Sequence, residues 1–375
     1  MAGAGRALLC FAGMATAFGP GRGVDRIRSF GSLADGRVVR AHSIGGEEGV
    51  HAEILDLGGI LARLRVPGSD GPVDAVLGLP HAQAYREDPA YLGILVGRYG
   101  NRIGGARFSL DGRAHVLAAN EGRNHLHGGM LGFGRRIWRV VEHRADALVL
   151  HHHSPAGEEG YPGNLDVTAT YRVDGQGLRL LFEARTDAAT PFNPTHHPYF
   201  NLAGDRSVPA AQQVLQVPAA GVLPVAQDLI PLGVVQSVAG TAFDFREAAS
   251  LQARMDGHDP QLRIAGGYDH CLVLAPGHAH VAALYSPHSG VAMRIDCDAP
   301  AVQLYGGQGL ARQHPGLGDG LCLEPQDYPD APNQPGFPPA ILRPGTACRR
   351  EIAYRFACPG RDCDWPGVGA ALGLP

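Results

Sequence analysis

The sequence predicts an all-β protein built mainly from antiparallel strands, and three observations support this. The 375 residues include 53 Gly and 29 Pro, and without a short repeat such a composition indicates many turns between short elements. Runs of alternating apolar and polar residues, the period of a strand with one buried face, recur from about residue 36 onward. Helical periodicity is scarce, and strands do not alternate with helices as they do in doubly wound and TIM-barrel folds.

The individual strands follow from turn signals between apolar runs. Residues 106–110 and 113–117 flank Asp111-Gly112, and an Asp-Gly pair accommodates the positive φ angles of a tight hairpin turn. The same reasoning predicts two further hairpins, a closing strand and a short helical stretch: residues 165–172 with 178–185, residues 281–286 with 291–296, residues 349–356, and residues 80–87.

No linker divides the chain, so residues 28–358 are predicted to form one large domain. Residues 1–27 and 359–375 are rich in Gly and Pro and are predicted to be a poorly ordered N-terminal extension and a C-terminal tail. Arg6 precedes a short apolar run that ends in a small-x-small pattern, which resembles a weak secretory signal. The sequence favours a cytoplasmic protein and leaves open a periplasmic or secreted one, if residues 1–17 act as a signal.

Composition excludes several classes of function. The net charge of −4 argues against a nucleic-acid partner, and no run approaches the roughly 20 apolar residues that span a membrane. All 32 basic residues are Arg, so Schiff-base lysine chemistry and the P-loop lysine are absent. The seven cysteines contain no C-x-x-C pair and are predicted to be reduced thiols, with a Cys358–Cys363 bridge as the alternative in an oxidising compartment.

Groups that bind or move protons concentrate in a few loop-like segments that interrupt the strand pattern, and catalytic groups tend to lie on such loops. The segments are residues 97–103 (GRYGNRI), 124–129 (NHLHGG), 195–202 (THHPYFNL) and 323–334 (LEPQDYPDAPNQ).

These segments resemble the aldose 1-epimerase (galactose mutarotase) family, and the resemblance extends over about residues 36–357. Further matches are Val66-Pro67 with the turn at Ser69-Asp70-Gly71, residues 157–163 (GEEGYPG), residues 241–245, and Tyr268-Asp269-His270. The resemblance implies a β-supersandwich of large antiparallel sheets with a carbohydrate cleft. It also implies that the protein interconverts the α and β anomers of a free aldose of the galactose or glucose type, as a monomer or weak homodimer.

This reaction needs one group to remove the proton of the anomeric hydroxyl and another to protonate the ring oxygen, and it needs no metal or redox cofactor. Residue by residue, the resemblance assigns Glu324 as the general base and His197 as the group that protonates the ring oxygen. His127 matches a second active-site histidine, and the division of roles between the two histidines stays open. The remaining matches are to sugar-contacting residues: Asn101, Arg102, Asp269 and Gln303.

The sequence departs from the family pattern beside these residues. His196 and Pro198 stand where Asn and Ser are common, and Tyr99-Gly100 replaces a small apolar pair. These changes put the hydrogen bonding of His197 and the sugar preference in doubt, but they remove no proton-transfer group.

Three alternatives stay open from the residues alone. His125 and His127 have the H-x-H spacing of a cupin-type metal site, although no glutamate follows within several residues. A non-catalytic carbohydrate-binding protein of the same fold would keep Arg102 and Asp269, which could also form a purely structural ion pair. A relative acting on phosphorylated sugars would need a basic pocket, and Arg135-Arg136 keep that interpretation open.

Overall fold

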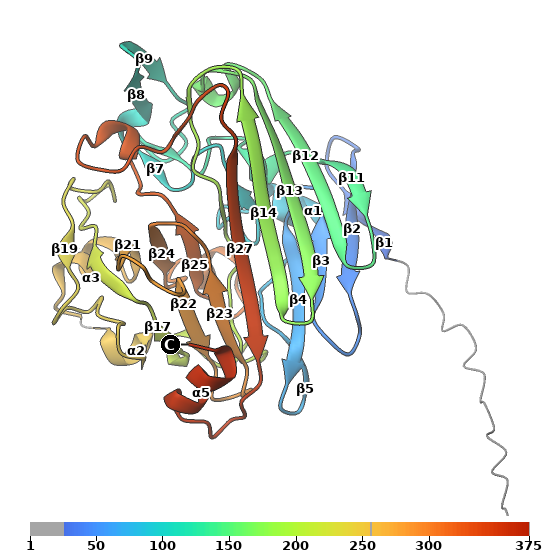
Figure 1. Ribbon diagram of the computed structural model, residues 1–375. Helices are drawn as coiled ribbons and strands as arrows, with labels where there is room; N and C mark the ends of the chain where they lie inside the picture. Colours follow the sequence, from blue (N-terminus) through green and yellow to red (C-terminus); the bar gives the residue numbers. More distant parts are fainter. Residues whose placement is uncertain (1–25, 256, 375) are drawn as a thin grey trace, which may run out of the picture.

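The computed structural model describes residues 26–255 and 257–374. Antiparallel sheets dominate it, and helices are short and peripheral (Figure 1). The all-β prediction is therefore confirmed. Residues 1–25, which contain Cys10 and the candidate signal segment, lie outside the described residues.

The largest sheet has nine strands and runs across the whole molecule (Figure 1). Its strands, in spatial order, are β11 (Arg139–His143), β12 (Ala147–Ser154), β13 (Leu165–Asp174), β14 (Gly177–Thr186), β27 (Cys348–Ala357), β23 (Ala292–Asp296), β22 (Ala282–Tyr285), β17 (Val214–Gln216) and β20 (Ala249–Ser250).

Two five-stranded sheets make up the other layer. The N-terminal one contains β1 (Ile27–Ser32), β2 (Val38–Gly45), β3 (His51–Leu55), β4 (Leu61–Gly68) and β5 (Gly71–Asp74) in sequence order. The second contains, in spatial order, β19 (Gln236–Ser237), β18 (Ala219–Val222), β21 (Asp269–Leu274), β24 (Ala301–Tyr305) and β25 (Cys322–Gln326).

Short elements connect and cover these sheets. The two-stranded pairs are β6 (Leu95–Val96) with β16 (Thr195–His196), β7 (Arg102–Ile103) with β10 (His125–Leu126), β8 (Arg107–Leu110) with β9 (Arg113–Val116), and β15 (Thr190–Pro191) with β26 (Ile341–Leu342). The α-helices are α1 (Ala82–Glu87), α2 (Leu251–Arg254), α3 (Pro260–Ala265), α4 (Leu310–Gln313) and α5 (Trp365–Leu372). Single 3₁₀ turns lie at Gly104–Ala106, Phe133–Arg135, Glu158–Gly160, Ala210–Gln212 and Ala331–Asn333.

One continuous core joins the layers, because alternate side chains of each sheet point inward. On β13 and β14, Val167, Tyr171 and Phe182 are fully buried between the sheets. They share a core with Ile54 of β3 and Leu304 of β24. Figure 1 shows β12, β13, β14 and β27 side by side, with β3 and β4 behind them. This two-layer packing is the sandwich that the family resemblance implied.

The local sequence predictions for the hairpins are confirmed. β8 pairs with β9 around Asp111 and Gly112, whose φ angles are 50° and 78°. β13 pairs with β14, and β22 pairs with β23. The strand predicted at residues 349–356 is β27, and it lies between β14 and β23 in the middle of the large sheet (Figure 1).

The poorly ordered C-terminal tail predicted for residues 359–375 is wrong for most of its length. Residues 365–372 form helix α5. Asp364 caps its N-terminus, and the helix ends at Gly373, which has a left-handed backbone conformation. Val368 and Leu372 pack against Tyr285 and Ala292 of the large sheet. Burial of these side chains stabilises a helix that is too short to form alone.

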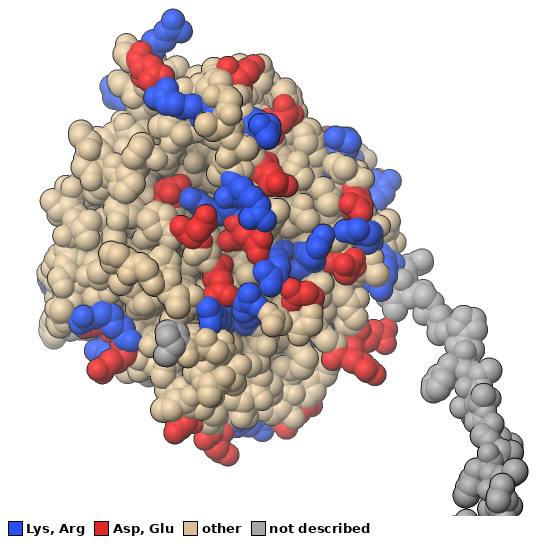
Figure 2. All heavy atoms as spheres, in the orientation of Figure 1, with Lys and Arg blue, Asp and Glu red and all other residues tan. Residues whose placement is uncertain are grey.

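Surface charge and thiols agree with the composition. Figure 2 shows basic and acidic side chains intermixed on the outer face of the large sheet; Arg179, for example, pairs with both Asp174 and Glu351. All six cysteines within the described residues are free, so Cys358 and Cys363 form no bridge. Within the same residues, no helix has the length and apolar composition needed to cross a membrane.

Candidate active site

All seven residues predicted from the sequence line one cavity of about 140 Å³. The lining combines the edge of the second five-stranded sheet with the loops around β6, β7, β10 and β16. The predicted residues are Asn101, Arg102, His127, His197, Asp269, Gln303 and Glu324.

The strand register of the second five-stranded sheet brings three of these residues together. Gln303 on β24 lies directly opposite Glu324 on β25 and opposite Cys271 on β21. Asp269 is two residues before Cys271, so its side chain emerges on the same face. The intervening residues point to the opposite face, where Leu323 belongs to the core.

The short strand pairs deliver the remaining residues. β7 pairs with β10, with Arg102 opposite Leu126, and this pairing sets Asn101 beside His127. β6 pairs with β16, which fixes the backbone just before His197. Asn101 and His127 have φ angles of 63° and 50°, a left-handed conformation that costs free energy in most residues and clusters at functional sites.

Glu324 and His197 form the central pair of the cavity. Glu324 Oε1 lies 3.6 Å from His197 Nε2, and the side chains are 2% and 5% exposed. Glu324 Oε2 has no hydrogen-bond partner in the protein. Burial, followed by the Asp269 charge, raises the pKa of Glu324 well above its usual value, and burial lowers the pKa of His197 to about 4. Burial therefore favours the uncharged form of both groups, the protonated carboxyl of Glu324 and the neutral imidazole of His197.

His127 is held in one neutral tautomer. Its Nδ1 accepts a hydrogen bond from the Asn101 backbone N–H at 3.2 Å, and a backbone N–H can only donate. Burial and then the neighbouring His197 lower the pKa of His127 well below its usual value. The single ring proton must therefore reside on Nε2, where it can donate to a group in the cavity.

Arg102 is bound by a carboxylate that sequence reasoning missed. Glu121 accepts from Arg102 Nε at 2.7 Å and from Nη2 at 2.8 Å. Asp269 Oδ2 lies 3.6 Å from Nη2 on the cavity side, and its Oδ1 accepts from Gln303 Nε2 at 2.6 Å. These contacts hold Asp269 with its oxygens available to a ligand, while Arg102 neutralises part of the negative charge.

Part of the cavity wall is formed mainly by residues that lie outside the sequence motifs singled out above. Tyr91, with φ 59°, packs its ring 4.8 Å from that of His127. Just before it, Asp88 accepts from the backbone of Ala90 and Leu92 and from His314 Nε2 at 2.7 Å. Asp88 and His314 therefore tie together two cavity walls that lie far apart in the sequence. Tyr199, Tyr305 and Gln313 complete this part of the lining.

The residues that depart from the family pattern lie outside the cavity. His196 points into the core, where Nδ1 lies 3.0 Å from the Tyr354 hydroxyl and Nε2 3.3 Å from the Tyr171 hydroxyl. Burial lowers the pKa of His196 to about 3. Tyr99 is also buried, and its hydroxyl donates to the Tyr328 carbonyl. The departure at His196 therefore changes the core behind His197 and adds no side chain to the lining of the cavity.

The H-x-H pair does not present two free nitrogens to one metal. His125 Nδ1 lies 2.7 Å from the Ala118 carbonyl, and its Nε2 lies 2.7 Å from the Tyr161 hydroxyl. His127 instead faces the cavity. Across residues 26–255 and 257–374, no group of three or more His, Cys, Asp or Glu side chains is arranged to hold a metal ion.

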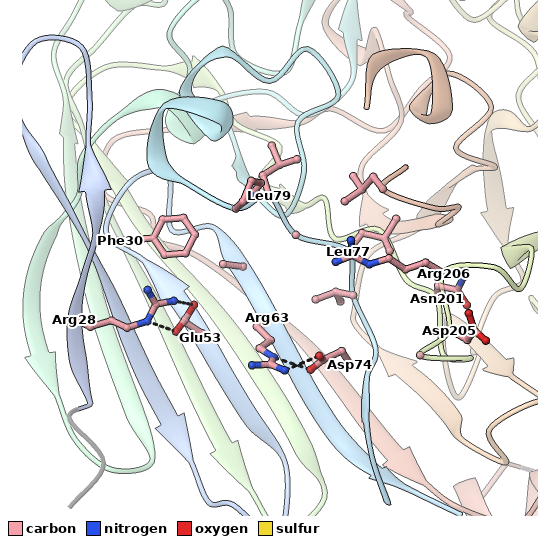
Figure 3. Close-up of a pocket in the computed structure, with 16 residues that line it drawn as sticks. Arg28, Phe30, Glu53, Arg63, Asp74, Leu77, Leu79, Asn201, Asp205 and Arg206 are labelled. Carbon is pink, nitrogen blue, oxygen red and sulfur yellow. Dashed lines mark hydrogen bonds and ion pairs between the residues drawn. The ribbon is translucent and has the colours of Figure 1, made fainter. Parts of the chain in front are cut away.

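A larger cavity, of about 500 Å³, lies over the N-terminal sheet. Four of its charged side chains form two ion pairs: Arg28 pairs with Glu53, and Arg63 pairs with Asp74 (Figure 3). Its lining contains no histidine and no buried carboxylate. The smaller cavity is therefore the one equipped for acid–base chemistry.

Comparison with known proteins shows the family of this chain. The aldose 1-epimerase family model matches residues 40–355. The chain is 37% identical over 320 residues to galactose mutarotase of Bos taurus, covering 82% of this chain and 91% of that protein. It is 35% identical over 336 residues to aldose 1-epimerase of Escherichia coli K12, covering 86% and 96%.

Solved structures extend the likeness to the fold. An aldose epimerase homologue from C. elegans superimposes with a TM-score of 0.78 at 30% identity, covering 85% of this chain and 98% of that chain. Galactose 1-epimerase from Lactobacillus acidophilus gives 0.75 at 28% identity, covering 88% and 97%. This chain therefore belongs to the aldose 1-epimerase family of isomerases, which interconvert the α and β anomers of free aldoses.

Proposed function

We propose that Glu324 is the general base and His197 the general acid of anomer interconversion on a neutral aldose of the galactose or glucose type. The observation that carries this is the buried Glu324–His197 pair, 3.6 Å apart in a cavity that also contains Arg102 and Asp269. A pair of titratable groups whose pKa values are set by burial is the usual arrangement for acid–base catalysis.

Ring opening starts from the other arrangement of the pair, in which the carboxyl proton of Glu324 has moved to His197 in the sugar complex. Glu324, as the carboxylate, takes the proton of the anomeric O1–H, and the O1–H electron pair forms the C1=O1 bond. The C1–O5 bond breaks, and O5 takes the proton of His197 Nε2. The enzyme then carries Glu324 as the acid and His197 as neutral imidazole, which is the arrangement that burial favours in the empty cavity.

Ring closure reverses these steps on the other face of the carbonyl. After rotation about C1–C2, His197 Nε2 takes the O5–H proton, O5 attacks C1, and Glu324 returns a proton to O1. The two arrangements of the pair have the same net charge, so the active site gains and loses no proton over the cycle.

His127 has a different role in this proposal. Because the Asn101 N–H occupies Nδ1, His127 can act as a base only if it first loses that hydrogen bond. It donates from Nε2 to a sugar oxygen and stays neutral throughout. Arg102, Asp269, Gln303 and Asn101 hold the sugar hydroxyls.

The charge of the cavity supports an uncharged substrate. Among the described residues that line it, Arg102 is the only Lys or Arg side chain, and Glu121 already holds its guanidinium. A phosphate group would meet Asp269 and Glu324 without a free cation. A protein that only bound sugars would have no need of the Glu324–His197 pair.

The test is polarimetry of freshly dissolved α-D-galactose and α-D-glucose in weak buffer, with wild type and Glu324→Gln. The amide keeps the shape but cannot take the proton, so turnover should fall at least about 10²-fold. Glu183→Gln, an exposed carboxylate on β14, is the matched control and should behave as wild type. Glucose 6-phosphate in the same assay distinguishes a sugar-phosphate epimerase.

The pH profile adds a second criterion. A pair that must hold one proton loses activity on the acid side when His197 takes up a second, and on the alkaline side when Glu324 loses the last. A folded Glu324→Gln variant with near-wild-type turnover, or a wild-type rate that does not vary with pH, would contradict the assignment.

A further inference from the structure

Two side chains of strand β25 lie beside the imidazole ring of His197. Cys322 and Glu324 are two positions apart, so both side chains lie on the face opposite the core residue Leu323. Glu324 Oε1 lies 3.6 Å from His197 Nε2. Cys322 Sγ lies 3.5 Å from His197 Nδ1, within hydrogen-bond range for sulfur.

The chemistry of Cys322 suits a partner of a group that changes protonation. The thiol is fully buried, and burial raises its pKa well above the usual value, so it carries no charge. A thiol both donates and accepts weakly. Its sulfur can accept from Nδ1–H of the imidazolium and also from Nδ1–H of the neutral ring that remains after Nε2 has given up its proton. A carboxylate in this place would instead raise the pKa of the ring.

We propose that Cys322 is a positioning residue for the epimerisation: its sulfur holds Nδ1 of His197 so that Nε2 faces Glu324 and the ring oxygen of the sugar. The proposal rests on the roles given above to Glu324 and His197. Cys322 itself takes no part in proton transfer to the substrate, and its effect is on the orientation and tautomer of the ring.

The size of sulfur matters to this arrangement. The C–O bond is shorter than the C–S bond, so a serine hydroxyl at position 322 falls short of Nδ1 unless the His197 ring moves. Such a movement draws Nε2 away from Glu324. Cys322→Ser should therefore be intermediate between wild type and Cys322→Ala, which removes the sulfur contact with Nδ1.

The experiment compares wild type, Cys322→Ala and Cys322→Ser. Cys297→Ala is the control, because Cys297 is a partly buried free thiol between β23 and β24 that lines no part of the cavity. Galactose mutarotation gives kcat and KM. Long-range ¹H–¹⁵N spectra of ¹⁵N-histidine protein report the tautomer of His197, with its signals assigned from His197→Gln.

We expect Cys322→Ala to lower kcat about 2- to 10-fold, the worth of one hydrogen bond, with KM unchanged. The ring ¹⁵N signals of His197 should shift, and Cys297→Ala should show neither effect. A folded Cys322→Ala variant with wild-type kcat and unchanged ring signals overturns the proposal. A loss of kcat with unchanged ring signals also overturns it, because the role is then only structural.

Two further outcomes of the experiment also decide the proposal. If Cys322→Ala does not fold, Cys322→Ser carries the same two measurements, and a wild-type tautomer and kcat in that variant overturn the proposal. If the wild type does not accelerate mutarotation, the roles of Glu324 and His197 fail, but the spectra still decide whether Cys322 holds the ring.

Discussion

Acid should destabilise this protein steeply, because its folded state contains many histidines that are buried in the neutral form. Burial lowers the pKa of six of them to between about 3 and about 4: His42, His125, His196, His197, His270 and His280. In the unfolded chain each has a pKa near 6.5. Above pH 6.5 both states are neutral, so no stability depends on these groups.

The effect begins as the pH falls below 6.5. The unfolded chain then binds protons that the folded protein binds only near pH 4, and the free energy of unfolding decreases. At pH 5 this amounts to about 2 kcal/mol for each histidine. With half of this value for each group, the six histidines together lower the free energy of unfolding by about 6 kcal/mol. This is a large part of the stability of a typical domain.

Two carboxyl groups act in the opposite direction. Burial raises the pKa of Asp56 and of Glu324, so these groups cost stability at neutral pH and return some of it as the pH falls. Two groups do not offset six. The net effect should be a urea unfolding midpoint that falls between pH 6.5 and pH 5. Tryptophan fluorescence at constant ionic strength measures this midpoint.

A single variant tests the reasoning. His280 is 4% exposed, and neither ring nitrogen has a hydrogen-bond partner, so His280→Phe keeps a planar aromatic ring at the site and removes one titrating group. Between pH 7 and pH 5 this variant should lose about 2 kcal/mol less than wild type. His288→Ala, at an exposed site, should lose as much as wild type. A flat midpoint from pH 7 to pH 5, or the same pH dependence in His280→Phe and wild type, would refute the reasoning.

Two predictions concern the residues that shape the cavity. Glu121→Gln weakens the ion pair between the buried Arg102 and the partly exposed Glu121. KM for galactose should therefore rise about 2- to 10-fold with little change in kcat. An unchanged KM would show that Glu121 does not orient Arg102. His314→Ala removes the side-chain partner of the buried Asp88 carboxylate, so the free energy of unfolding should fall by about 1–3 kcal/mol in urea titration, and His314→Gln should restore part of it. Equal stability of wild type and His314→Ala would contradict the role of this tie between the cavity walls.

The sequence by itself determined the local elements. Asp111-Gly112 specifies a hairpin because only a few residues tolerate positive φ, and the alternation along residues 165–185 specifies two strands because one face must be buried. The seven residues that line the smaller cavity were also predicted together, because the resemblance rested on ordered motifs around Arg102, His197 and Glu324. Helix α5 was missed although its signals, Asp364 before Pro366 and Gly373 at the end, are present.

Tertiary structure decided how the groups of the site act on one another. Glu121 lies 19 residues from Arg102, and Cys322 lies 125 residues from His197, so no spacing in the sequence announces either contact. The direction of His196, into the core between Tyr171 and Tyr354, also depends on which sheet packs behind it. The pKa shifts of Glu324 and His197 follow from burial, and burial is a property of the packed sheets. A chain whose strands were formed but not yet stacked would leave both groups in water with ordinary pKa values.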